Sequence, residues 1–141
     1  MEESKIRELI AKALEMRNFS YTPYSHFNVG AAILAKNGKI FTGCNIENAS
    51  FTPTNCAERT AFFKAVSEGV KEFEAIAIVG GPDGATELDY CAPCGVCRQV
   101  MSEFCRDDFI IITAKSETEY RTETLDENLP YRFGPKDLLG L

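Results

Sequence analysis

Two cysteine motifs, far apart in the sequence, constrain this chain more than any other feature. The first is Cys56-Ala57-Glu58 and the second is Pro93-Cys94-Gly95-Val96-Cys97. A structural zinc site is closed by four protein ligands, whereas a catalytic zinc site has three and leaves its fourth position for water. Cys56, Cys94 and Cys97 supply three thiol ligands and leave that position open. The fold must therefore bring the two motifs together.

Glu58 is the candidate proton carrier of this site. It lies two residues from Cys56, so on a helix it points about 200° away around the axis and is not expected to bind the same metal. A free carboxylate can take a proton from activated water, pass it to a ring nitrogen and later protonate a departing amine. Such general acid–base help is worth ~10²–10⁴-fold. A glutamate at a helix start is also favoured by the helix dipole, and both roles can hold together.

Each ligand group begins a predicted helix, and this placement has an electrostatic consequence. Three thiolates carry one negative charge more than zinc neutralises. A helix start carries roughly half a positive charge and free N–H groups, which lower thiol pKa values and offset the excess. Arg59 can add a full charge by donating hydrogen bonds to the sulfur ligands. The alternative is that Arg59 is a surface arginine.

Three cysteines outside the predicted ligand set are expected to be free thiols, because buried cysteine behaves as a small hydrophobe: Cys44, Cys91 and Cys105. Cys91, Cys94 and Cys97 are evenly spaced, so either adjacent pair could bind metal. We prefer Cys94 with Cys97 because Pro93 suits the first turn of the helix that follows. A fourth ligand from Cys91 would close the site and make the zinc structural, which is the main non-enzyme alternative.

Composition excludes several classes of protein. The 141 residues are 45% hydrophobic, which is enough for one domain spanning residues 1–141. No secretory signal is readable and no apolar run approaches the ~20 residues that span a bilayer, so we expect a cytoplasmic protein without a membrane partner. In that setting, six cysteines favour metal binding over disulfides. A net charge of -6 argues against a nucleic-acid partner and fits a small neutral or cationic substrate.

Hydrophobic spacing predicts a layered α/β domain with a mixed sheet. Asn37-Gly38 is the strongest short hairpin signal in the chain. The expected helices are 3–17, 56–68, 94–104 and a short one at 136–139, and the expected strands are 28–35, 39–43, 75–80, 109–114 and 119–124.

The spacing of the two cysteine motifs is specific. A lone C-x-x-C is weak, but C-x-E followed by P-C-x-x-C matches the zinc deaminase pattern, with cysteine in place of histidine at the first ligand. Over essentially its whole length the chain resembles the small cytidine deaminases of the three-cysteine, homotetrameric type. The motifs that carry the resemblance are Pro23-Tyr24-Ser25-His26-Phe27, Gly43-Cys44-Asn45-Ile46-Glu47-Asn48-Ala49, Cys56-Ala57-Glu58-Arg59-Thr60-Ala61 and Pro93-Cys94-Gly95-Val96-Cys97-Arg98-Gln99.

This resemblance implies a three-layer α/β/α fold with a mixed five-stranded sheet, one zinc ion per subunit, and a homotetramer with shared pockets. It implies that Cys56, Cys94 and Cys97 bind zinc and that Glu58 carries protons. The residues that it places against the substrate are Phe27 on the pyrimidine, Asn45 and Glu47 on the ribose hydroxyls, Ala57, and the aromatic residues Phe51 and Phe133, which close the pocket from neighbouring subunits.

Elementary chemistry permits these substrate roles. Asn45 and Glu47 alternate at a strand end, so their side chains point to one face and suit a hydroxyl-rich sugar. Phe27 on its own would be assigned to the core. Phe51 stands where many relatives carry tyrosine, and residues 51–55 depart from the usual loop. His26, the only histidine, is expected to be structural.

The function implied is hydrolytic deamination of cytidine and deoxycytidine to uridine and deoxyuridine, with release of ammonia, in pyrimidine salvage. Water activated by zinc attacks C4 while Glu58 moves the protons. The alternatives are a deaminase of another aminopyrimidine, such as an antibiotic nucleoside, and a non-catalytic zinc or thiol-redox module. A polymer-editing deaminase is disfavoured because the acidic composition lacks phosphate-binding charge.

Overall fold

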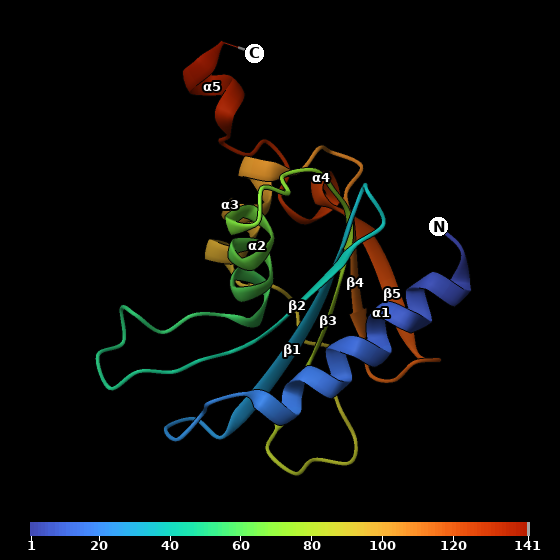
Figure 1. Ribbon diagram of the computed structural model, residues 1–141, viewed down its shortest axis with the longest axis vertical. Helices are drawn as coiled ribbons and strands as arrows, with labels where there is room; N and C mark the ends of the chain where they lie inside the picture. The colour runs from blue at the N-terminus through green and yellow to red at the C-terminus, as the bar shows by residue number, and fades with distance from the viewer. Residues whose placement is uncertain (141) are drawn as a thin grey trace.

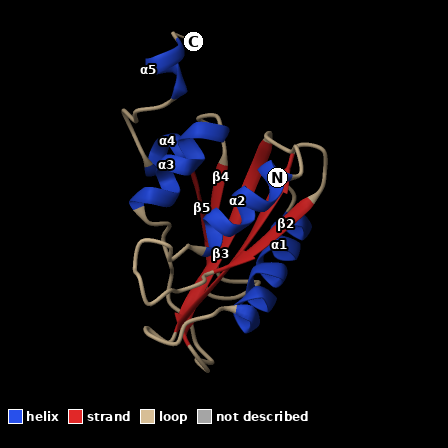
Figure 2. Ribbon diagram, turned by 60° about the vertical axis from the view of Figure 1, so that its left-hand side comes forward, coloured by secondary structure: helices blue, strands red, loops and turns tan. Residues whose placement is uncertain are grey.

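The computed structural model describes residues 1–140 and places helices on both faces of one five-stranded sheet (Figures 1 and 2). Across the sheet the strands lie in the order β2-β1-β3-β4-β5. β3 and β4 are parallel, and all other neighbours are antiparallel. The mixed sheet and the three-layer fold are therefore confirmed. The strands are β1 (Phe27–Ala35), β2 (Ile40–Cys44), β3 (Phe73–Pro82), β4 (Ile110–Ala114) and β5 (Tyr120–Thr124).

The two faces of the sheet carry different helices. α1 (Glu3–Met16) covers one face, where Leu9 and Ile10 pack with Ala32 and Leu34 of β1. α2 (Ala57–Ser67) and α3 (Gly95–Phe104) cover the other, against Ala31, Ile33 and neighbouring residues. Successive residues of a strand point to opposite faces, so β1 supplies both layers. The remaining helical segments are a 3-10 turn (Arg17–Phe19), α4 (Leu125–Asn128) and α5 (Pro135–Leu139).

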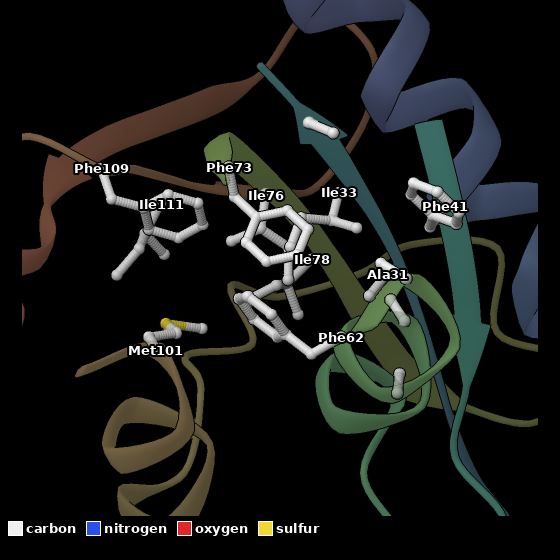
Figure 3. Close-up of a cluster of buried hydrophobic side chains, with 14 of the residues drawn as sticks. Ala31, Ile33, Phe41, Phe62, Phe73, Ile76, Ile78, Met101, Phe109 and Ile111 are labelled. Carbon is white, nitrogen blue, oxygen red and sulfur yellow. The ribbon is translucent and has the colours of Figure 1, made fainter. Parts of the chain in front are cut away.

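Aromatic packing fixes α2 and α3 on the sheet (Figure 3). Phe62 of α2 meets Phe73 of β3 edge to face, with ring centroids 5.1 Å apart, and stacks on Phe104 of α3 at 6.4 Å. Met101 of α3 is fully buried in the same cluster. Because both helices are anchored to one core, their N-terminal ends are held on the same side of the sheet.

Gly43 lets β2 approach the start of α2. A Cβ at this position would lie 2.3 Å from the carbonyl oxygen of Ala57 and 2.7 Å from the backbone nitrogen of Ala61. No side chain fits there without moving the helix. The first turn of α2, which carries the first metal motif, is therefore pressed directly against the sheet.

Every helix and strand predicted from the sequence is present, with bounds that agree within two residues. The placement of Pro93 in the first turn of α3 is wrong. Cys94 is the N-cap, with an extended backbone and a sulfur that accepts a hydrogen bond from the Cys97 N–H, so the helix begins at Gly95. The sequence analysis also missed α4, which Thr124 and Glu127 begin with a capping box. Within residues 1–140, no helix is long and apolar enough to cross a membrane.

Candidate active site and metal centre

Three thiols converge where α2 and α3 begin. The sulfur atoms of Cys56, Cys94 and Cys97 all lie within 4.8 Å of one another. Cys56 is the N-cap of α2, Cys94 is the N-cap of α3, and Cys97 lies in the first turn of α3. The Cys56 and Cys94 sulfurs are 3.7 Å apart. Tetrahedral zinc with Zn–S bonds of about 2.3 Å requires a separation of about 3.8 Å, so the donor set fits zinc.

Arg59 supplies positive charge to this cluster. Its Nη2 donates a hydrogen bond to the Cys56 sulfur at 3.2 Å, while its Nε is buried without a hydrogen-bond partner. The guanidinium therefore faces the sulfurs, in place of the surface position weighed as its alternative. The Cys97 N–H, which belongs to the first turn of α3, donates to the Cys94 sulfur at 3.4 Å. The charge of Arg59 and a helix-start N–H thus both stabilise negative sulfur.

The metal-free thiols share protons unequally. A hydrogen bond from Cys97, with a further contribution from Arg59, lowers the pKa of Cys56 to about 5. The same hydrogen bond, together with burial, raises the pKa of Cys97. Cys56 therefore gives up its proton more readily than Cys97, and binding of a metal ion requires both thiols to be deprotonated.

Glu58 is buried beside the thiols, with 4% of its surface exposed. Burial, reinforced by the negative charge of Cys56, raises the pKa of its carboxyl to about 7 in the metal-free chain. A group that titrates near neutral pH can both accept and donate a proton. Glu58 lies outside the metal-binding group, as expected. The expected angle of about 200° between Cys56 and Glu58 on one helix does not apply, however, because the Cys56 backbone is extended and lies outside the helix.

Cys91 is not a member of the metal-binding group found in residues 1–140. Its sulfur packs on Gly80 of β3, only 2.8 Å from the position that a Cβ there would occupy. Burial raises the pKa of the Cys91 thiol to about 11. The group thus has three protein ligands, as a catalytic zinc site requires, and not the four of a closed one. Cys44, Cys91 and Cys105 form no disulfide within residues 1–140, and none of them belongs to the thiol group.

The polar residues after β2 hold the start of β1. The Asn45 side chain accepts a hydrogen bond from the Val29 N–H at 2.9 Å and donates to the Phe27 carbonyl at 2.8 Å. The Glu47 carboxylate accepts from the N–H groups of Tyr24 and Ser25, at 3.1 and 3.2 Å, and from the Ser25 hydroxyl. The Ser25 hydroxyl is the main cause of the lowered Glu47 pKa.

This segment also runs beside the first metal motif. Ile46 and Asn55 exchange two backbone hydrogen bonds of 2.9 Å. Thr60, in the first turn of α2, donates to the carbonyl of Cys44 at 3.1 Å. The segment that contains Asn45 and Glu47 is consequently tied to Asn55, the residue that precedes the Cys56 thiol.

The predicted aromatic contacts are exposed in the single chain. Phe27 is 39% exposed, Phe51 83% and Phe133 59%. Phe51 lines a shallow hollow together with Glu47, whereas Phe133 lies after α4, where its carbonyl accepts a hydrogen bond from Gln99 of α3 at 2.9 Å. Ala57, the first residue of α2, is buried between Cys56 and Glu58. Phe133 is therefore not among the residues that line the hollow beside Phe51.

Sequence reasoning assigned no role to Ser25, Thr60 or Gln99. Each makes a side-chain hydrogen bond to a candidate site residue or its flanking backbone. Ser25, Thr60 and Gln99 stand inside the motifs already noted, so their position in those motifs was the only available signal. Their partners lie on other elements, and only the fold reveals them.

Comparison with known proteins gives a consistent result. The family model "Cytidine and deoxycytidylate deaminase zinc-binding region" matches residues 3–113. A cytidine deaminase from Sporosarcina psychrophila is 45% identical over 133 residues, which are 94% of this chain and 94% of that protein. The crystal structure of cytidine deaminase from Burkholderia pseudomallei is 43% identical, with a TM-score of 0.80 over 89% of this chain and 97% of that chain.

A blasticidin-S deaminase from Bacillus cereus is also similar, at 34% identity over 130 residues that cover 89% of this chain and 90% of that protein. The family match covers most of the sequence and includes all three thiols. Zinc is the metal that this thiol group fits, and the chain belongs to the cytidine and deoxycytidylate deaminase family.

Proposed function

We propose that this protein deaminates cytidine and deoxycytidine by hydrolysis, giving uridine and deoxyuridine with release of ammonia. The observation that carries the proposal is a group of three thiols, with no fourth protein ligand among residues 1–140, beside the buried carboxyl of Glu58. Three protein ligands leave a coordination position for water. Relatives named cytidine deaminase, similar over most of the chain, support the choice of substrate.

The metal would be held by Cys56, Cys94 and Cys97. Zinc supplies Lewis-acid chemistry that makes water a stronger acid and stabilises negative charge at the reacting centre. Arg59 stabilises the sulfur ligands by its hydrogen bond to Cys56. This hydrogen bond counters the excess negative charge of three thiolates, which would otherwise weaken the acidity of the water.

Glu58 moves the protons. It takes one from water as oxygen adds to C4 of the pyrimidine, and it delivers that proton to the ring nitrogen N3. It then takes the remaining proton from the hydroxyl on C4 and gives it to the amine, so that the C4–N bond breaks, ammonia leaves and the C4 carbonyl of uridine forms. The burial of Glu58 beside the thiols suits a group that must accept and donate a proton in one cycle, because burial disfavours the charged form of a carboxyl.

Asn45 and Glu47 bind the sugar, and Phe27 stacks on the pyrimidine. Two of the four hydrogen-bonding positions of the Asn45 amide are used by the backbone, which leaves one donor and one acceptor for a ligand. Three of the roughly four acceptor positions of the Glu47 carboxylate are occupied, which leaves one. A single sugar hydroxyl can satisfy both residues, which fits acceptance of the deoxynucleoside.

The remaining parts of the proposal rest on the family resemblance. Residues 1–141 form one catalytic domain, and the protein is a cytoplasmic homotetramer that serves pyrimidine salvage without a nucleic-acid or membrane partner. Phe51 and Phe133 close pockets shared between subunits, and Ala57 contacts the substrate. Light scattering on a sizing column should give four times the mass of the chain, and a monomer would contradict this part.

The direct test is turnover by the purified zinc-loaded protein. Cytidine, deoxycytidine, cytosine and CMP are followed by loss of ultraviolet absorbance, and ammonia is measured as the second product. We expect both nucleosides to react well and the free base and the nucleotide to react poorly. Zinc content of one ion per chain is measured on the same sample. No turnover of any of the four substrates would contradict the proposal.

A second candidate is deamination of an antibiotic nucleoside, which the similarity to a blasticidin-S deaminase favours. Blasticidin S therefore joins the substrate panel. Faster turnover of the antibiotic than of cytidine would replace the first proposal with the second. A non-catalytic zinc module is less consistent with a buried carboxyl beside three ligands.

A further inference from the structure

The Ser25 hydroxyl joins the two halves of the proposed nucleoside site. It donates a hydrogen bond to Glu47, the proposed sugar-binding residue, and accepts one from the N–H of Phe27, the proposed pyrimidine platform, at 3.1 Å. A hydroxyl has one donor hydrogen and two acceptor lone pairs. Because an ionised carboxylate can only accept, the hydrogen of Ser25 points at Glu47, and a lone pair of the same oxygen receives the Phe27 N–H.

The two oxygens of Glu47 are held differently. Oε1 accepts from two backbone N–H groups, those of Tyr24 and Ser25. Within residues 1–140, the Ser25 hydroxyl is the one donor to Oε2. Removal of that hydroxyl would leave Oε1 anchored and let Oε2 rotate about it. The free acceptor position for a sugar hydroxyl lies on Oε2 by this count, so its direction depends on Ser25.

The backbone turn around Ser25 fixes where its hydroxyl points. His26 adopts a left-handed conformation, with φ of 57°, which is uncommon outside glycine. Its N–H donates to the Thr22 carbonyl at 3.0 Å, and its own carbonyl accepts from the Asp83 N–H at 2.7 Å. These two hydrogen bonds of His26 hold the turn that contains Ser25. The Ser25 hydroxyl therefore contacts Glu47 before any substrate binds.

We propose that Ser25 is a positioning residue that orients the Glu47 carboxylate toward the sugar and sets it relative to Phe27. The inference deepens the proposed function and rests on it. Ser25 does not touch the reacting atoms. It acts on nucleosides that carry a ring hydroxyl on the sugar, and it has no effect on the chemistry at C4.

The test is the Ser25→Ala variant, assayed as zinc-loaded protein on cytidine and on 2′,3′-dideoxycytidine, which lacks both ring hydroxyls. We expect kcat/KM for cytidine to fall about tenfold, mainly through KM, because a hydrogen bond to a charged group is lost. The value for dideoxycytidine should change less than about twofold, since Glu47 has no hydroxyl to bind. Equal losses on both substrates would mean a general structural role and overturn the proposal.

A matched pair separates the hydroxyl from the shape of the side chain. Ser25→Thr keeps a hydroxyl, and Ser25→Val replaces it with a methyl of similar size. Thr should retain several times more activity on cytidine than Val, while equal values for the two would overturn the assignment. Thermal melting of all variants verifies that the fold is retained.

A double-mutant cycle identifies the residue through which Ser25 acts. Ser25→Ala in a Glu47→Ala background should reduce cytidine turnover by less than about twofold, because the carboxylate to be positioned is gone. A full tenfold loss in that background would overturn the proposal. The wild type keeps the two proposals apart: if it deaminates neither cytidine nor dideoxycytidine, the proposed function fails, whereas if it deaminates both equally well, deamination stands and the role of Ser25 in sugar recognition is overturned.

Discussion

The metal end and the sugar end of the candidate site are built differently. At the metal end, Glu58 and Cys97 are buried and the thiols meet within one chain. At the sugar end, polar side chains are held by the backbone of the β1 entry, but the rings of Phe27, Phe51 and Phe133 remain exposed. A single chain thus contains all the groups of the candidate metal end. It does not by itself enclose the substrate at the sugar end. Substitutions at the metal end and at the sugar end should therefore differ in the property that they affect as well as in the size of the effect.

Metal removal should have the largest effect. Dialysis against a chelator is expected to abolish turnover and zinc addition to restore it, because Cys56, Cys94 and Cys97 hold the only metal-binding group found in residues 1–140. The hydrophobic core around Phe62 does not include the ligands that start each helix, so circular dichroism should retain most helical signal while the melting temperature falls.

Two cysteine variants serve as a matched pair for that experiment. Cys97→Ala removes a ligand and should lose both zinc and activity, while Cys105→Ala removes a partly buried thiol outside the group and should keep both. Metal content by atomic absorption is measured beside turnover. Full activity in metal-free protein would break the assignment of the metal end.

Glu58→Gln should come next in size. The amide keeps the shape of the side chain but cannot carry protons, so kcat should fall by about 10²–10⁴-fold at unchanged zinc content. Glu74→Gln, on an exposed position of β3, is the control and should behave as wild type. Turnover within a few-fold of wild type in Glu58→Gln would remove the carboxyl from the mechanism.

Phe133→Ala tests whether the open sugar end is closed by a neighbour. We expect about a tenfold loss in kcat/KM for cytidine, through lost aromatic contact, with zinc content unchanged. Refolding this variant together with Glu58→Gln chains should recover activity if Phe133 acts in the pocket of another subunit. In such a mixed assembly, the Phe133 ring of a Glu58→Gln chain closes the pocket of a Phe133→Ala chain, whose Glu58 carboxyl is intact. No recovery would place Phe133 on its own pocket or outside any pocket.

Sequence periodicity and motif spacing predict most of this fold and its metal end. The strands and helices follow from hydrophobic spacing, and the three thiols follow from the specific order C-x-E and P-C-x-x-C. The helix boundary at Pro93 failed because a cysteine can cap a helix with its own sulfur. α4 was not predicted because a helix of four residues is too short to show hydrophobic periodicity, although Thr124 and Glu127 have the spacing of a capping box.

The sugar end is less readable because its contacts join distant segments. Ser25 meets Glu47 only after β1 and the segment that follows β2 have been brought side by side. The preference for Cys97 over Cys91, made from the position of Pro93, agrees with the thiol group of the structure, and the packing of Cys91 on Gly80 adds a reason that even spacing along the chain cannot reveal. The local sequence pattern therefore identifies the metal ligands. The residues that orient the functional side chains are found only from tertiary contacts.

Phe51→Tyr, at the exposed sugar end, should change the kinetic constants less than the other substitutions do. The ring is 83% exposed and lines a hollow with Glu47, so a new hydroxyl there could reach the sugar or a neighbouring chain. One added hydrogen bond at an exposed site should lower KM for cytidine by roughly twofold to threefold and leave kcat unchanged. Phe63→Tyr, on an exposed part of α2, is the matched control and should alter neither constant. A lower KM confined to Phe51→Tyr would show that this surface is used by the bound nucleoside, while identical constants in both variants would separate Phe51 from the substrate.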